Sequence, residues 1–197
     1  LHRNSSLESR RILMINIAMM GCDSSHTESY ALLINKPGSP FYDKAQIQWL
    51  WGQEPSQAQK KAEICDIPQI VQNPEEAIIG ADLVMVCNRF GDDHFEPARL
   101  AIEAGKPTFV DKPFTNDPQQ ARDLRFMAED RGVPLISFSP LRFATEMQEV
   151  VATLPHIGLL YGMVITGPAE AFLPDPRAKS LYFYGSHAVD MMKTLVK

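Results

Sequence analysis

The sequence predicts an α/β protein built on a doubly wound parallel sheet. From residue 11 to about residue 138, short apolar runs alternate with amphipathic stretches, which is the pattern of repeated strand–helix units around a parallel sheet. The apolar runs are almost continuous rather than alternating, for example ILMINIAMM at 12–20 and LVMVC at 83–87. Such runs are typical of strands that helices cover on both faces.

The element boundaries follow from these runs and from the residues between them. Strands are expected at 12–20, 46–51, 83–87, 107–110 and 134–138, and helices at 26–35, 56–65, 74–79, 96–104 and 118–131. Pro97 and Pro118 lie in first helical turns, where proline is favoured, and Gly105 and Gly132 follow helices as C-terminal stops.

The pattern changes after residue 138. A helix is expected at 144–154, a strand at 159–166, a proline-rich loop at 168–176 and a last helix at 186–196. One strand and two helices are too few for an independent core. Residues 141–197 are therefore expected to open a second, α+β domain whose remainder is absent, after a first domain at 1–140.

Composition excludes several classes of protein. The 197 residues are 45% hydrophobic and 22% charged, with a formal net charge of -5, and no cluster of Lys and Arg with interleaved aromatics predicts a nucleic-acid partner. Cys22, Cys65 and Cys87 are odd in number and far apart, which favours free thiols in a cytoplasmic protein over a disulfide framework. Cys22 and His26 could meet one helical turn apart, but two ligands alone do not predict a metal site.

The stretch SRRILMINIAMMGC near the start has two interpretations. Twin arginines before a short apolar run and Gly-Cys resemble an export signal or a lipoprotein cleavage site. The same run fits a buried first strand, because it spans only about nine residues and leads into a strand-to-helix turn. We favour the strand. No other segment approaches the length needed to span a membrane, so no membrane partner is expected.

The turn after the first strand is a candidate phosphate site. In a doubly wound fold the amides and dipole of the helix N-terminus favour an anion there. Only Gly21 matches the G-x-G-x-x-G fingerprint, and the candidate cofactor contacts are Gly21, Cys22, Asp23, Ser24, Ser25 and His26. Ser24 and Ser25 can donate to a phosphate or cap the helix, and both interpretations stay open.

The second strand should end in an acidic residue that holds the adenine ribose. The sequence offers Gly52, Gln53 and only then Glu54. Glu54 could bind a ribose hydroxyl, or it could be an exposed loop residue. The lack of an arginine after this strand favours NAD over NADP, because a 2′-phosphate usually needs a cation there.

One long stretch carries a resemblance to a known family. Residues 84–114, VMVCNRFGDDHFEPARLAIEAGKPTFVDKPF, run from a strand through a polar loop, His94, a helix, Ala-Gly-Lys and a strand to Asp-Lys-Pro. This resembles the Gfo/Idh/MocA oxidoreductases, NAD(P)-dependent sugar and inositol dehydrogenases whose hallmark is Glu-Lys-Pro. Asp111 departs conservatively from the hallmark, while Lys112 and Pro113 match it. The resemblance extends over residues 11–195.

The resemblance implies a Rossmann-type NAD(P)-binding domain at 1–140 and roles for particular residues. Lys112 is expected to lie beside the nicotinamide and to contact the reacting hydroxyl, where a cation stabilises developing alkoxide charge. Asp111 is expected beside the cofactor as well. Such a lysine precedes a proline that could form a cis bond. His94 is expected near the nicotinamide or as a helix cap, and Arg89 near the cofactor, where many relatives have Thr.

A second element, YFYGSHAVDMM at 182–192, resembles the family's G-x-H-x-x-D. It implies that His187 faces the substrate as the acid/base, and that Asp190 contacts the substrate or orients His187, or pairs elsewhere. Many relatives have an acid where this chain has Phe183, so Tyr182 or Tyr184 would have to compensate.

The implied function is reversible hydride transfer between NAD or NADP and a hydroxyl carbon of a sugar, cyclitol or related polyol. Homo-oligomers are expected if the full second domain is present. The alternative is a protein of the same fold that binds a ligand without reaction or has lost the cofactor.

Overall fold

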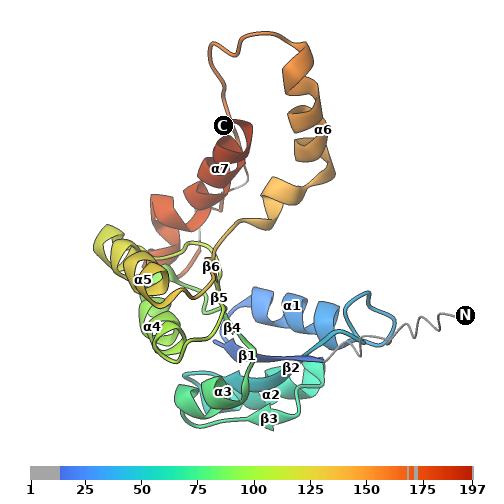
Figure 1. The fold of residues 1–197 in the computed structure, drawn as a ribbon, viewed down its shortest axis with the longest axis vertical. Coiled ribbons are helices and arrows are strands. Elements are labelled where there is room, and N and C mark those ends of the chain that lie inside the picture. The colour runs from blue at the N-terminus through green and yellow to red at the C-terminus, as the bar shows by residue number, and fades with distance from the viewer. Residues whose placement is uncertain (1–13, 168, 171–172, 197) are drawn as a thin grey trace, which may run out of the picture.

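The computed structural model describes residues 14–167, 169–170 and 173–196, and its centre is a six-stranded sheet (Figure 1). The strands lie in the order β3-β2-β1-β4-β5-β6, and every neighbouring pair is parallel. Their bounds are β1 (Ile15–Met20), β2 (Ala45–Trp51), β3 (Gln69–Ile70), β4 (Leu83–Val86), β5 (Thr108–Val110) and β6 (Leu135–Ile136). This order confirms the predicted Rossmann-type doubly wound sheet.

The helices that connect the strands are close to their predicted places. They are α1 (Ser25–Asn35), α2 (Pro55–Cys65), α3 (Pro74–Gly80), α4 (Phe95–Glu103) and α5 (Pro118–Arg131). Beyond the sheet come α6 (Thr145–Thr153) and α7 (Leu181–Leu195), with short 3-10 turns at Gly91–Asp93, Pro140–Phe143, Leu154–His156 and Pro176–Lys179. None of the helices described is long and apolar enough to cross a membrane.

Side chains of the central strand β1 divide the core into two halves. Ile17 and Met19 pack on one face of the sheet with residues of α1 and α2. Ala18 and Met20 pack on the other face with residues of α3, α4 and α5. Because both halves are apolar, β1 reads as a continuous apolar run, as expected for a strand covered on both faces.

An irregularity in β2 decides where its two tryptophans point. Ile17 of β1 pairs with Ile47, but Ala18 pairs with Trp49, so one extra residue is inserted in β2. Such a bulge shifts the alternation of side chains. Trp49 and Trp51 therefore pack on the face of the sheet that α3 and α4 cover. Trp51 is the last residue of β2, at the carboxyl edge of the sheet.

Three predictions about secondary structure need correction. β3 was missed, since it has only two residues, and these pair with Trp49 and Leu50. The strand expected at 159–166 is not a strand, because no neighbouring strand in the described chain offers it hydrogen bonds. α7 begins at Leu181 rather than at residue 186, and it includes Gly185, a residue of low helix propensity. Residues 12–13 of the first predicted apolar run lie outside the described residues.

The N-terminal end of α7 packs against the loop after β4. Phe183 and Ala178 are buried against Phe90, with Leu173 and Tyr184 beside them. Arg177 adds an ion pair to Asp93 at 3.2 Å. Figure 1 shows that α6 and α7 lie together beyond β6, away from α2 and α3. This contact brings residues of α7 to the carboxyl ends of β4 and β5.

Candidate functional site

The turn after β1 packs tightly on the loop after β4. Gly21 has φ +100°, and a Cβ atom there would lie 2.5 Å from the Asn88 backbone nitrogen. Buried Thr27 ties the two segments together, because its hydroxyl donates to the carbonyls of Gly21 (3.0 Å) and Cys87 (3.4 Å). Gly21 is therefore required for close approach within the protein at the switch point of the sheet.

The polar residues of this turn are mostly engaged with the protein itself. Ser24 is the N-cap of α1, and its hydroxyl accepts from the backbone N–H of His26 at 3.1 Å. Asp23 Oδ1 accepts from the backbone N–H of Arg89 at 3.1 Å. Cys22 is buried, its thiol donates to the Glu54 carbonyl at 3.8 Å, and burial raises its pKa.

His26 forms an ion pair or hydrogen bond with Asp111 of the Asp-Lys-Pro segment. The His26 Nδ1 and Asp111 Oδ2 atoms are 2.6 Å apart, and Asp111 is buried. Asp111 Oδ1 and the nearby Tyr30 hydroxyl have no hydrogen-bond partner among the described residues. Burial, followed by the charge of Asp111, raises the pKa of Tyr30.

Lys112 follows β5 and leads into a cis bond to Pro113, as expected for the Lys-Pro turn. Its Nζ lies 5.1 Å from the centroid of the Phe183 ring. Burial lowers the pKa of Lys112, and the charge of Arg89 lowers it further, while Asp111 acts in the opposite direction.

His94 contacts the backbone of the turn that follows Lys112. Its Nδ1 lies 2.9 Å from the Pro113 carbonyl and its Nε2 2.8 Å from the Asn88 carbonyl, and the ring is fully buried. His94 is the N-cap residue of α4, as one of its two predicted roles requires, but its ring makes no capping hydrogen bond. His94 instead connects the loops that follow β4 and β5.

His187 is held by the loop after β6. Its Nδ1 lies 2.6 Å from Ser139 Oγ. Burial lowers the pKa of His187, and the charges of Lys112 and His26 add to this effect. The hydrogen bonds and ion pair of the Asp190 carboxylate go to residues other than His187. The carboxylate accepts from the Ser139 backbone N–H at 2.8 Å and pairs with Arg142 at 3.3 Å.

These segments enclose a pocket of about 230 Å³ at the carboxyl ends of β1, β4 and β5. It is lined by Ser24, Ser25, His26, Arg89, Asp111, Lys112, Phe183, Tyr184 and His187. Lys112 and His187, which the sequence places 75 positions apart, thus face one cavity. The other predicted site residues, Gly21, Cys22, Asp23, Glu54, His94 and Asp190, are not among its lining residues.

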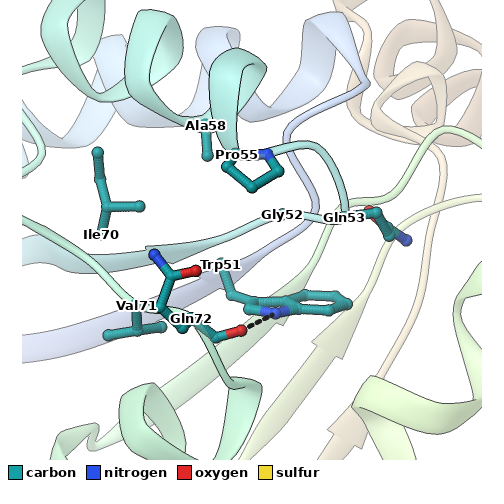
Figure 2. Close-up of a pocket in the computed structure, with 8 residues that line it drawn as sticks. All are labelled: Trp51, Gly52, Gln53, Pro55, Ala58, Ile70, Val71 and Gln72. Atoms are coloured by element: carbon teal, nitrogen blue, oxygen red, sulfur yellow. Dashed lines mark hydrogen bonds between the residues drawn. The ribbon is translucent and has the colours of Figure 1, made fainter.

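A second pocket of about 170 Å³ lies where β2 and β3 end (Figure 2). Its lining is uncharged and consists of Trp51, Gly52, Gln53, Pro55, Ala58, Ile70, Val71 and Gln72. The Trp51 indole Nε1 donates to the Gln72 carbonyl at 3.3 Å, as Figure 2 shows. Its apolar side chains offer surface against which a flat aromatic base could pack, beside the polar groups of Gln53 and Gln72.

The position expected for a ribose-binding acid has no side chain. A Cβ atom on Gly52 would overlap the Cys22 side chain, lying 2.8 Å from its Cβ. Glu54 is the N-cap residue of α2 and is exposed, and it is not among the residues that line the pocket.

The two pockets together fit a dinucleotide in outline. The second offers an uncharged slot for the adenine. The N-terminus of α1 and the side chains of Arg89 and Lys112 line the first. Asn88 is fully buried beside Gly21, and neither end of its amide has a partner among the described residues. These features fit NAD(P) despite the missing glycines. No group of three or more potential metal ligands occurs in the described part of the chain.

Sequence reasoning missed two residues of the site. Ser139 orients His187, and its only sequence signal is the Ser-Pro pair that predicts a turn. Asn88, with its unpartnered amide, has no signal that distinguishes it from other polar loop residues. Tyr184 lines the pocket, whereas Tyr182 does not.

Comparison with known proteins gives the family. The model of the Gfo/Idh/MocA oxidoreductase family, NAD-binding Rossmann fold, matches residues 15–138. The chain belongs to the Gfo/Idh/MocA family of NAD(P)-dependent oxidoreductases. It is 28% identical over 142 residues to the uncharacterized oxidoreductase YhhX of Escherichia coli K12, a match that covers 66% of this chain and 38% of YhhX.

Two further relatives bear on the function of the family. The inositol 2-dehydrogenase of Cereibacter sphaeroides is 35% identical over 74 residues, which is 38% of this chain and 22% of that enzyme. The crystal structure of scyllo-inositol dehydrogenase from Lactobacillus casei with bound NAD(H) and scyllo-inositol has a TM-score of 0.63 at 14% identity, covering 73% of this chain and 41% of that one. This last likeness concerns the fold alone. The chain spans well under half the length of these relatives.

Proposed function

We propose that the chain takes part in reversible hydride transfer between NAD(P) and a hydroxyl carbon of a sugar, cyclitol or related polyol. The observation that carries this proposal is that Lys112 and His187 line one pocket at the carboxyl end of the sheet. Open α/β folds bind their ligands at this edge. Membership of an oxidoreductase family with an inositol dehydrogenase among its members supports the choice of reaction.

Each residue has a chemical task in this reaction. When His187 Nδ1 donates to Ser139 Oγ, Nε2 is free to take the proton of the substrate hydroxyl. Lys112, as a cation, stabilises the negative charge that develops on the same oxygen. NAD(P), when bound, would supply the acceptor for the hydride of that carbon, so that the alcohol would be oxidised to a carbonyl compound. The lowered pKa of His187 favours its neutral form, which can accept the hydroxyl proton.

NAD is the preferred cofactor in this proposal. The pocket at the end of β2 has no cation to hold a 2′-phosphate, and exposed Glu54 lies beside it. The test is titration of the protein with NADH and NADPH while nicotinamide fluorescence is followed. We expect tighter binding of NADH. No binding of either nucleotide would overturn the proposed function.

The tryptophans supply a control for the place of binding. Trp51 lines the proposed adenine slot, and the other tryptophan, Trp49, does not. Trp51→Phe should weaken NADH binding, while Trp49→Phe should leave it nearly unchanged.

One observation favours a second candidate, a ligand-binding protein without turnover. Phe183 lies over Lys112 where many relatives have an acid. In that case NADH or a polyol would bind, but no reduced cofactor would form in the presence of NAD and any polyol.

The cellular location and the assembly remain proposals. Cys22, Cys65 and Cys87 are free and buried, which fits a cytoplasmic protein. A homo-oligomer is proposed for a form of the protein that includes a full second domain.

A further inference from the structure

The pocket that contains Lys112 has an excess of positive charge. Its lining includes Arg89, Lys112 and two histidines, against the single carboxylate of Asp111. Asp111 is already engaged, because its Oδ2 atom lies 2.6 Å from His26. None of the ion pairs formed by the described residues includes Arg89 or Lys112.

The guanidinium of Arg89 is held against apolar rings. Its central carbon lies 5.8 Å from the ring centroid of Phe90 and 5.9 Å from that of Phe183. The side chain is half-buried. A guanidinium in such a place offers planar paired donors that match a carboxylate, and water satisfies it less fully than at an open surface.

Two carboxylates near Arg89 do not neutralise it. Asp175 pairs with Arg177 at 2.9 Å. Asp23 accepts the backbone N–H of Arg89 rather than its side chain. Asp23 also places negative charge in the turn where a pyrophosphate would lie, which makes Arg89 better suited to an anion on the Lys112 side of the pocket.

We propose that the substrate of this site is a polyhydroxy acid, whose carboxylate binds Arg89 while a neighbouring hydroxyl reacts between Lys112 and His187. This inference rests on the proposed hydride transfer and narrows its substrate class from neutral polyols to their acids. The pocket, at about 230 Å³, is below the roughly 300 Å³ at which sites for larger ligands begin, so it suits a small molecule of this kind. An anion would also offset the repulsion between Arg89 and Lys112.

The test compares two ligands that differ in one group. D-gluconate and D-glucitol have the same six-carbon polyhydroxy chain, and only gluconate has a carboxylate. Calorimetric titration of the protein, with and without saturating NAD, should show gluconate binding at least about tenfold more tightly, as for one charge-assisted contact. Equal binding, tighter binding of glucitol, or no binding of either ligand would overturn the inference.

Two variants locate the contact. Arg89→Gln should reduce the affinity for gluconate to that for glucitol. The control, Arg125→Gln, removes the same charge from the exposed face of α5 and should change the affinity for neither ligand. If Arg89→Gln instead weakens NADH binding and leaves gluconate unchanged, Arg89 holds the cofactor phosphates and the inference is wrong. The NADH titration on the unaltered protein is read separately, so failure of cofactor binding and failure of acid recognition give different results.

Discussion

Nδ1 of His26 lies 2.6 Å from Oδ2 of Asp111, which ties the first turn of α1 to the residue that precedes Lys112. The two residues are 85 positions apart, and Asp111 is buried while His26 reaches the pocket. A buried carboxylate is stable only when it is paired or hydrogen-bonded. His26 is therefore the group that allows Asp111 to occupy this place.

Removal of His26 should destabilise the fold. His26→Ala leaves both oxygens of Asp111 without a partner among the described residues, so we expect the free energy of unfolding to fall by about 2–3 kcal/mol. Urea denaturation measures the change. The double variant His26→Ala/Asp111→Asn should lose clearly less than the sum of the single variants. Additive losses would show that the two side chains are not coupled.

A methyl group at Gly21 should be costly for a reason beyond backbone angle. Gly21 and Gly105 both have positive φ, +100° and +73°, but only at Gly21 would a Cβ meet other atoms, those of Asn88. Gly105→Ala should lower the free energy of unfolding by about 1 kcal/mol. Gly21→Ala should lower it by roughly 2 kcal/mol more, because the loop after β4 must shift. Thermal or urea unfolding of the two variants measures these changes. Similar decreases in the free energy of unfolding for both variants would contradict the close packing of Gly21 on Asn88.

Lys112 is expected to act on the reaction and not on the cofactor. In a form of the protein that turns over a substrate, Lys112→Ala should reduce turnover by ~10²-fold or more, while the affinity for NADH stays almost unchanged. Steady-state kinetics and a cofactor titration measure the two effects. Lys60→Ala, on the exposed face of α2, is the control and should retain full turnover. Undiminished turnover of Lys112→Ala would leave Asp111-Lys112-Pro113 as a structural turn.

His187 should make the stability of the fold depend on pH. Its pKa is lower in the folded chain than the ordinary value of about 6.5, so the unfolded chain binds more protons in the range just below that value. The free energy of unfolding should therefore fall as pH drops through about 6.5 and level off below the folded pKa. His187→Gln removes this contribution, so the difference between the two proteins should vary with pH in this window. A difference that is constant from pH 8 to pH 5 would be evidence against a lowered pKa.

Much of the sheet could be predicted from the sequence because its strands are buried on both faces. Continuous apolar runs such as 83–87 are easily recognised, and proline or glycine marks the ends of α4 and α5. The short β3 could not be recognised, since two residues provide no periodicity. The segment 159–166 has the composition of a strand, but a strand also needs a partner, and composition does not reveal whether one is present.

The site was predictable where a local motif identifies a residue and not where distant residues meet. Lys112 and His187 each lie in a recognisable motif, and both line the pocket. The contact between His26 and Asp111 depends on the packing of α1 against the end of β5, which no local pattern contains. Asp190 belongs to the same motif as His187, yet its carboxylate holds Ser139 and Arg142, partners that come from a different segment.

The contact between Gly52 and Cys22 restricts how this protein can evolve. An acid at the end of β2 would need space that the Cys22 side chain fills. Gly52→Asp should be harmful alone and tolerated only after Cys22 has become Gly, so the order of the two mutations matters. Descendants of this chain are therefore expected to have a larger residue at position 52 only where position 22 has become small, and exchange of Gly52 alone should be rare.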